Sequence, residues 1–152
     1  MSRLAAILPA RRRPEPRGLP VYDPGRELRA ERRARELLRS VVGPDAFEAY
    51  DRLGFIAVER GGYGYLLYPH RPIVSYDLES GELLSEYCVR FPDGADRDPD
   101  ARLPDADDVL AKWIALAGDE RGLIADSNMH LPGRQHDPKH LRRDLDRLAQ
   151  LR

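Results

Sequence analysis

Residues 55–91 constrain the fold most, because only there do apolar and aromatic residues alternate with polar ones over a long stretch. A period of two is typical of β-strands with one buried face, whereas amphipathic helices repeat every three to four residues. Turn-forming residues divide this stretch into four segments. The sequence therefore predicts a four-stranded antiparallel β-meander at the centre of an α+β fold.

The four predicted strands are residues 55–59, 63–68, 73–77 and 83–91. The first two are joined through Gly61-Gly62, a pair that can supply the positive φ angles of a type I′ turn. That turn sets Val58 opposite Tyr65 and Ile56 opposite Leu67. In the last strand, the residues expected to share the packed face are Leu83, Tyr87, Val89 and Phe91.

Helical spacing of apolar residues flanks the predicted sheet on both sides in the sequence. A first helix is expected at residues 27–42 and a short second one at residues 46–53, where Asp45 and Glu48 resemble a capping box. A third helix is expected to start near Asp105 or Asp107 and to carry Trp113 toward the sheet. We expect these helices to pack on one face of the meander.

The first 25 residues contain five prolines and five arginines, which favours an extended arm over regular structure. Residues 1–42 carry 11 Arg against 5 acidic residues, whereas the remainder carries 14 basic against 21 acidic residues. The chain thus has a basic start and an acidic body. The expected organisation is a Pro/Arg-rich arm at 1–25, an α+β domain at 26–128, a linker at 129–136 and a C-terminal helix at 137–152.

The C-terminal helix is predicted from Asp137 as its cap and Pro138 at its first position. Its apolar residues form a narrow stripe of Leu141, Leu145, Leu148 and Leu151. A stripe this narrow suits docking on a partner or on the body of the protein, because a single helix of this length is marginally stable alone. These four leucines are therefore the candidate protein-interaction residues.

The remaining composition favours a cytoplasmic protein without a membrane span. Cys88 is the only cysteine, so an intrachain disulfide is excluded. The longest apolar run near the start, residues 4–8, is too short for the core of a signal peptide or for a membrane span.

No residue pattern predicts a metal, a cofactor or a catalytic group. His136 and His140 are four residues apart, as in helical metal pairs, but the expected helix begins between them. The aspartates of residues 92–104 lack the order of an EF-hand loop. Cys88 lies in the middle of a strand with no histidine near it in the sequence, so an inert strand residue is the expectation.

Nucleic-acid binding is the second hypothesis. Arg11, Arg12 and Arg13 form a short basic run that could contact phosphates. Residues 60–68 resemble the first ribonucleoprotein motif of RNA recognition motifs, whose aromatic residues stack on bases. The candidate residues there are Arg60, Tyr63, Tyr65 and Tyr68. A meander without intervening helices differs from that fold, and sheet packing explains the tyrosines equally well.

Several short segments resemble a small uncharacterised α+β domain that recurs in actinobacterial and phage proteins. They are Arg35-Glu36-Leu37-Leu38, Gly54-Phe55, Val58, Tyr65-Leu66-Leu67, Tyr87-Cys88, Leu103-Pro104, Asp107 and Ser127-Asn128. In that domain a charged helix leads into a meander with a Cys-bearing last strand, a Leu-Pro turn and a closing helix. The resemblance covers residues 26–128 and departs at Pro72-Ile73, where Asn is expected before the apolar residue. It implies the fold, but no activity, cofactor or catalytic residue.

The first functional hypothesis is a non-catalytic protein-interaction module of a bacterial or phage protein. It would bind a protein partner, or a second copy of itself, through the arm, the C-terminal helix or an open sheet face. Nucleic-acid binding by the arginine arm and the tyrosine hairpin is the first alternative. A small enzyme whose site does not show in the sequence is the second.

Overall fold

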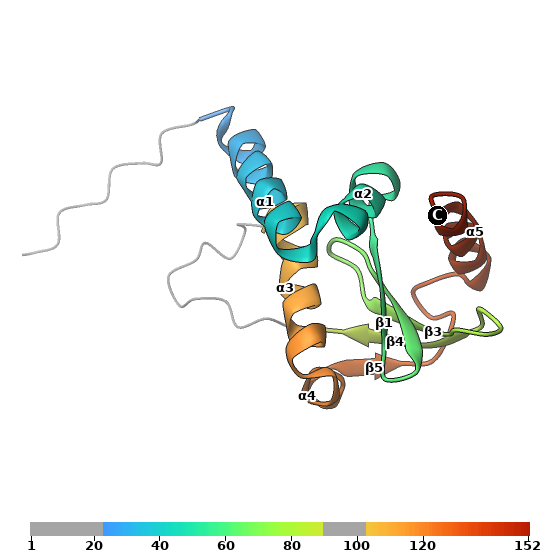
Figure 1. Cartoon of the computed structure of the whole chain (residues 1–152). Helices are drawn as coiled ribbons and strands as arrows, with labels where there is room; N and C mark the ends of the chain where they lie inside the picture. Colours follow the sequence, from blue (N-terminus) through green and yellow to red (C-terminus); the bar gives the residue numbers. More distant parts are fainter. Residues whose placement is uncertain (1–22, 90–102) are drawn as a thin grey trace, which may run out of the picture.

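The computed structural model describes residues 23–89 and 103–152, and these residues form an α+β fold (Figure 1). The elements, in chain order, are α1 (Arg26–Val42), α2 (Pro44–Leu53), β1 (Ile56–Arg60), β2 (Tyr63–Leu67), β3 (Ile73–Asp77), β4 (Leu83–Cys88), α3 (Asp105–Gly118), α4 (Glu120–Asp126), β5 (Asn128–His130) and α5 (Pro138–Ala149). The expected arm and the acidic loop fall almost entirely outside the described residues.

The strands follow one another in the sheet in the order β1-β2-β3-β4-β5, and every neighbouring pair is antiparallel. The predicted meander is thereby confirmed for its first four strands. Its register is also confirmed, because Val58 pairs with Tyr65 and Ile56 with Leu67. Gly61 and Gly62 have φ angles of 59° and 86°, as a tight turn of the primed type requires.

The prediction of four strands was wrong by one. Asn128–His130, which overlaps the expected linker, pairs with β4 so that Met129 lies opposite Tyr87. A strand of three residues is too short to show an alternating pattern. The strand forms because backbone groups at the edge of β4 are available for hydrogen bonds. This is a tertiary effect that cannot be predicted from the local sequence.

A β-bulge between β3 and β4 corrects the predicted packing of the last strand. Ser75 pairs with Ser85 but Tyr76 pairs with Leu83, so Leu84 is the extra residue. Beyond a bulge the side chains change faces. Leu83 therefore lies on the opposite face from Tyr87, and the prediction that the two share a face was wrong.

Helices cover both faces of the sheet, whereas the sequence predicted cover on one face only (Figure 1). One face, called the α3 face, is covered by α1, α2 and α3. The core between this face and the helices consists of Ala34, Leu38, Tyr50, Ile56, Tyr65, Leu67, Ile73, Ala106, Val109, Leu110 and Leu116. The opposite face, called the α5 face, is covered by α5. The core on this side consists of Phe55, Leu66, Tyr68, Val74, Tyr76, Leu83 and, from the helix, Leu141. β2 and β3 carry apolar residues on both sides, so each side needs a cover.

The helix ends agree with the local sequence signals. Pro44 stands in the first turn of α2, and Gly54 ends that helix with a φ of 84° and an N–H bond to the Tyr50 carbonyl. Asp137 caps α5 by accepting from the Lys139 N–H at 2.8 Å. No helix of the described residues is long and apolar enough to cross a membrane.

Candidate functional site

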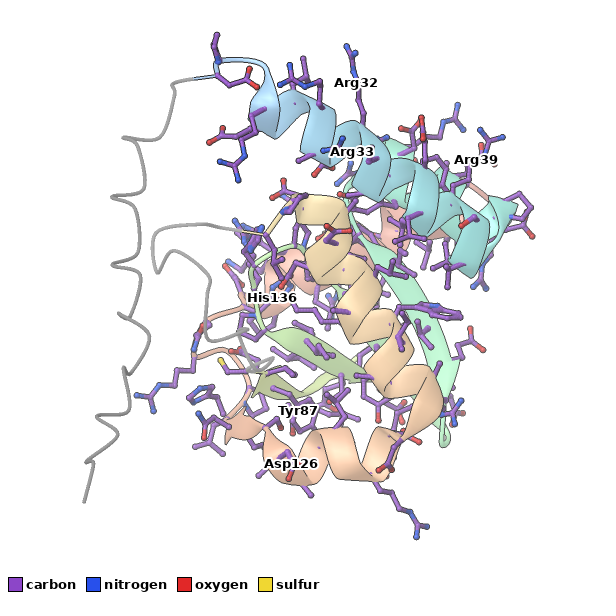
Figure 2. All side chains as sticks on the ribbon, turned by 90° about the vertical axis from the view of Figure 1, so that its left-hand side faces the viewer. Arg32, Arg33, Arg39, Tyr87, Asp126 and His136 are labelled. Atoms are coloured by element: carbon purple, nitrogen blue, oxygen red, sulfur yellow. The ribbon has the colours of Figure 1, made fainter. Side chains whose placement is uncertain are left out.

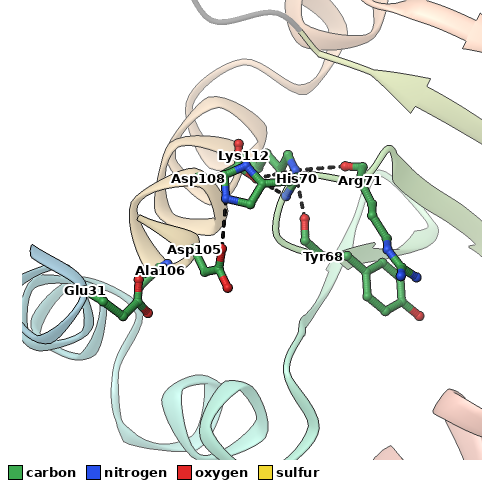
Figure 3. A network of polar contacts seen from close by, with 8 residues as sticks. All are labelled: Glu31, Tyr68, His70, Arg71, Asp105, Ala106, Asp108 and Lys112. Atoms are coloured by element: carbon green, nitrogen blue, oxygen red, sulfur yellow. Dashed lines mark hydrogen bonds and ion pairs between the residues drawn. The ribbon is translucent and has the colours of Figure 1, made fainter. Parts of the chain in front are cut away.

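A buried lysine of α3 binds the backbone of the corner between β2 and β3 (Figure 3). Lys112 is only 3% exposed, and its Nζ donates to the carbonyl oxygens of Tyr68 and Arg71, each at 2.8 Å. The third bond goes to Asp108 Oδ2 at 2.5 Å. All three donors of the ammonium group are therefore satisfied, as a buried cation requires.

Asp108 also fixes the backbone of the corner. Its Oδ2 accepts from the His70 N–H at 2.7 Å. His70 has a φ of 54°, a left-handed conformation that residues other than glycine rarely adopt. Pro69 and Pro72 flank this position in the sequence and restrict their own φ angles. The corner is thus a rigid turn, held from α3.

A polar hollow of about 350 Å³ opens at this corner. Its lining consists of Gly54, Tyr68, Pro69, His70, Arg71 and Asp105. His70 Nε2 lies 2.9 Å from Asp105 Oδ1, which is ion-pair distance when the ring is protonated, and this buried nitrogen has no hydrogen-bond partner within the described residues. Arg71 is exposed and forms no ion pair with any described residue.

The other end of Tyr68 reaches α5. Its hydroxyl donates to Asp144 Oδ2 at 2.7 Å, and Asp144 is only 3% exposed. Arg143 and Arg147 flank this carboxylate at 3.2 and 3.4 Å. Burial, and next the bond to Asp144, raise the pKa of the Tyr68 hydroxyl, because both disfavour a tyrosinate. Tyr68 thus connects α3 through its carbonyl and α5 through its hydroxyl.

A second buried carboxylate positions the chain just before α5. Glu86 of β4 is fully buried and accepts from the backbone N–H groups of Gln135 and His136, each at 2.9 Å. His136 is 7% exposed, and its ring centroid lies 5.2 Å from that of Tyr68. Burial lowers the pKa of His136, because the charged imidazolium would lose its hydration. These contacts anchor the expected linker to the sheet.

The outer face of α5 is basic and bears an open hollow between its side chains. The hollow has a volume of about 510 Å³ and is lined by Pro138, Lys139, Arg142, Arg143, Asp146, Arg147 and Gln150. The inner face carries the predicted leucine stripe: Leu141 is 1% exposed, and Leu145, Leu148 and Leu151 are half-buried. The leucines therefore lie toward the body of this chain, and the cations of the helix remain outside.

The tyrosines of the predicted nucleic-acid hairpin do not form a common surface. Tyr65 is buried on the α3 face, where its hydroxyl donates to Glu120 Oε1 at 2.6 Å, and Tyr68 is buried on the α5 face. Tyr63 is 49% exposed, and Arg60 lies 4.0 Å from Glu120. Arg11, Arg12 and Arg13 lie outside the described residues.

Metal-ligating residues do not gather in the described part of the chain. No group of three or more His, Cys, Asp or Glu residues there could hold a metal ion. His136 and His140 lie with their ring centroids 6.4 Å apart. Cys88 is half-buried, with Gln135 Nε2 at 3.6 Å from its sulfur.

The residues that build the corner were not among the predicted site residues. Lys112 and Asp108 stand four residues apart on the same helix side as Val109 and Leu116, so two charges interrupt an apolar stripe. A charged pair on the inner face of a helix is a signal of a buried ion pair. His70 offered no comparable signal, because its left-handed backbone depends on the contact with Asp108.

The described residues define an α+β fold with a five-stranded antiparallel sheet between two helical layers. No family model, no curated protein and no solved structure matches the chain. The resemblance to the actinobacterial and phage domain stays a prediction.

Proposed function

We propose that the chain is a non-catalytic interaction module that binds an acidic segment of a partner protein through the outer face of α5. The observation that carries this proposal is the division of α5 into two faces. Its leucines pack toward the sheet, while Lys139, Arg142, Arg143 and Arg147 surround a hollow. Cations gathered around an open hollow favour a partner of opposite charge.

The acidic residues near α5 neutralise only part of this face. Asp137 caps the helix, and the buried Asp144 pairs with Arg143 and Arg147 at 3.2 and 3.4 Å. Asp146 is the acidic residue that lines the hollow. Lys139 and Arg142 are exposed and form no ion pair with any described residue. These two side chains are the best candidates for direct contacts with a partner carboxylate.

The charge of the body favours a short acidic segment over a long polyanion. Residues 43–136 contain 9 basic and 18 acidic residues. A nucleic acid that continued past α5 would meet this negative body, whereas a short segment would not. The helix is about 18 Å long at 1.5 Å per residue, so an extended acidic segment of about six residues covers it.

The test is a titration of the full chain with a labelled peptide of about six alternating Asp and Ser residues, a length set by the span of α5. The variant carries Lys139→Gln and Arg142→Gln. The matched control carries Arg32→Gln and Arg33→Gln, which remove the same charge from the exposed side of α1 (Figure 2). Fluorescence anisotropy reports the affinity at low and at moderate salt.

We expect the α5 variant to bind the peptide about tenfold more weakly, which is about 1.4 kcal/mol for two lost exposed contacts. The α1 control should change the affinity less than about twofold. An equal loss of affinity in both variants would show that only the net charge of the protein matters, and it would contradict the proposal. Tighter binding of a single-stranded oligonucleotide of equal charge, lost in the α5 variant, would support the nucleic-acid hypothesis instead.

A further inference from the structure

We propose that the polar hollow at the corner between β2 and β3 binds a small ligand through a carboxylate or phosphate group, with Arg71 as its main contact. The hollow is lined by Arg71, His70 and Asp105, and its volume of about 350 Å³ is at the lower end of small-molecule sites. This site lies apart from the outer face of α5 and does not depend on the function proposed for that face.

The corner between β2 and β3 is built in an unusual way. Three energetically unfavourable features occur together at one short surface turn. They are the left-handed backbone of His70, the buried ammonium of Lys112 and the buried carboxylate of Asp108. A plain connection between two antiparallel strands needs none of them. Backbone held in a rare conformation by buried polar groups is a feature that gathers at binding sites.

Arg71 offers a guanidinium group to a ligand at this corner. Its carbonyl oxygen is held by Lys112 Nζ at 2.8 Å, which fixes the base of the side chain. Its guanidinium has no ion-pair partner among the described residues, and its side chain extends beside Tyr68 (Figure 3). Arg71 is part of the lining of the hollow. A guanidinium presents paired donors that match the two oxygens of a carboxylate or phosphate. An arginine whose backbone is held and whose guanidinium has no ion-pair partner among the described residues is therefore available to an acidic ligand.

His70 and Asp105 are two further polar residues that line the hollow. His70 Nε2 is buried without a hydrogen-bond partner in the described residues, so a ligand oxygen beside it would complete its bonding. Asp105 lies 2.9 Å from this nitrogen and is 59% exposed, so its charge opposes an anion at the rim. Arg71 and Asp105 therefore have opposite effects on anion affinity, which makes the inference directly testable.

The experiment follows backbone amide shifts of the full chain by NMR during titration with inorganic phosphate and, separately, with acetate. We expect saturable shifts at Gly54, His70 and Arg71. Arg71→Gln should weaken the binding about tenfold or more, whereas Asp105→Asn should strengthen it about three- to tenfold by removing an opposing charge. The control is Arg52→Gln, which removes a charge from the exposed side of α2 and should leave the affinity unchanged.

Thermal unfolding of each variant establishes that the fold is kept. The stronger response to phosphate or to acetate assigns the acid group of the ligand. Shifts that do not saturate, or an affinity that is the same with Arg71 and with Gln at this position, would overturn the inference. Weaker binding in Asp105→Asn would also overturn it, because the carboxylate would then be a contact of the ligand and not an opposing charge.

Discussion

The hydroxyl of Tyr68 donates to the buried carboxylate of Asp144 at 2.7 Å, joining the end of β2 to a helix that lies 76 positions further along the chain. This bond holds α5 on the sheet in one rotation about its axis. Because Asp144 faces inward, the residues on the other side of the helix, Lys139 and Arg142 among them, face solvent. The proposed binding face therefore depends on an inner contact.

Removing this hydroxyl tests the contact. We expect Tyr68→Phe to lower the free energy of unfolding by about 2 kcal/mol, the usual loss for a hydrogen bond to a charged group. Urea denaturation measures the change. Tyr63→Phe is the control, because Tyr63 is 49% exposed, and it should cost less than about 0.5 kcal/mol. A loss of the same size in both variants would show that the bond to Asp144 contributes nothing specific.

Lys112 is expected to be the most sensitive polar position of the described fold. Lys112→Met leaves the Asp108 carboxylate and two carbonyl oxygens buried without their donor. Breaking one partner of a buried ion pair costs about 3–5 kcal/mol. Adding Asp108→Asn removes the unpaired charge, so the double variant should be less destabilised than the sum of the two single variants. Additive losses in urea denaturation would contradict a coupled pair.

The sequence predicts much of the framework, because its signals are local. The alternation of residues 55–91, the glycines of the first hairpin and the helical spacing before and after them fix most elements and the register of β1 and β2. β5 could not be predicted, because its three residues form a strand only against β4. The bulge at Leu84 leaves an apolar pattern that reads equally well as an uninterrupted strand.

The candidate sites were less predictable, because they depend on contacts between distant segments. The leucines of α5 fitted docking on a partner or on the body, and the contacts of Leu141 and Leu145 with the α5 face show that they dock on the body. Tyr65 and Tyr68 read as a stacking surface until their burial on opposite faces is known. At the corner, His70 contacts Asp108, which lies 38 positions further along the chain. No local sequence pattern predicts a contact between such distant residues.

The packing of α5 can be tested through its central leucine. Leu141 is 1% exposed among aromatic and aliphatic side chains of the sheet. We expect Leu141→Ala to cost about 2–5 kcal/mol, because it removes buried surface and leaves a cavity. Leu148→Ala should cost clearly less, since Leu148 is only half-buried. Equal and small losses in both variants, measured by thermal or urea unfolding, would mean that α5 is not docked on the sheet.

The burial of His136 gives the stability a dependence on pH. Its pKa in the folded protein is lowered from the usual 6.5, chiefly by burial. The charges of Asp144 and Glu86 raise this pKa, whereas His140 and Arg71 lower it further. A lowered pKa means that the unfolded chain binds the proton first as the pH falls. The contribution is therefore fully present above pH 6.5 and is lost as the pH falls from there toward the lowered pKa of the folded state.

The comparison that isolates this effect is His136→Gln, which has no titrating ring. Between about pH 7 and about pH 5 the original protein should lose more unfolding free energy than the variant, because only the original gains a proton on unfolding in this range. Urea denaturation at a series of pH values gives both slopes. Parallel slopes would show that His136 does not contribute to the pH dependence.

The most direct test of the proposed function is to map where an acidic peptide binds on the full chain. The peptide of alternating Asp and Ser is titrated while backbone amide shifts are followed by NMR. We predict saturable shifts at the amides of α5 around Lys139, Arg142 and Arg143, and none of that size on α1. Shifts confined to α1, or shifts that do not saturate anywhere, would contradict the claim that the outer face of α5 is the binding surface.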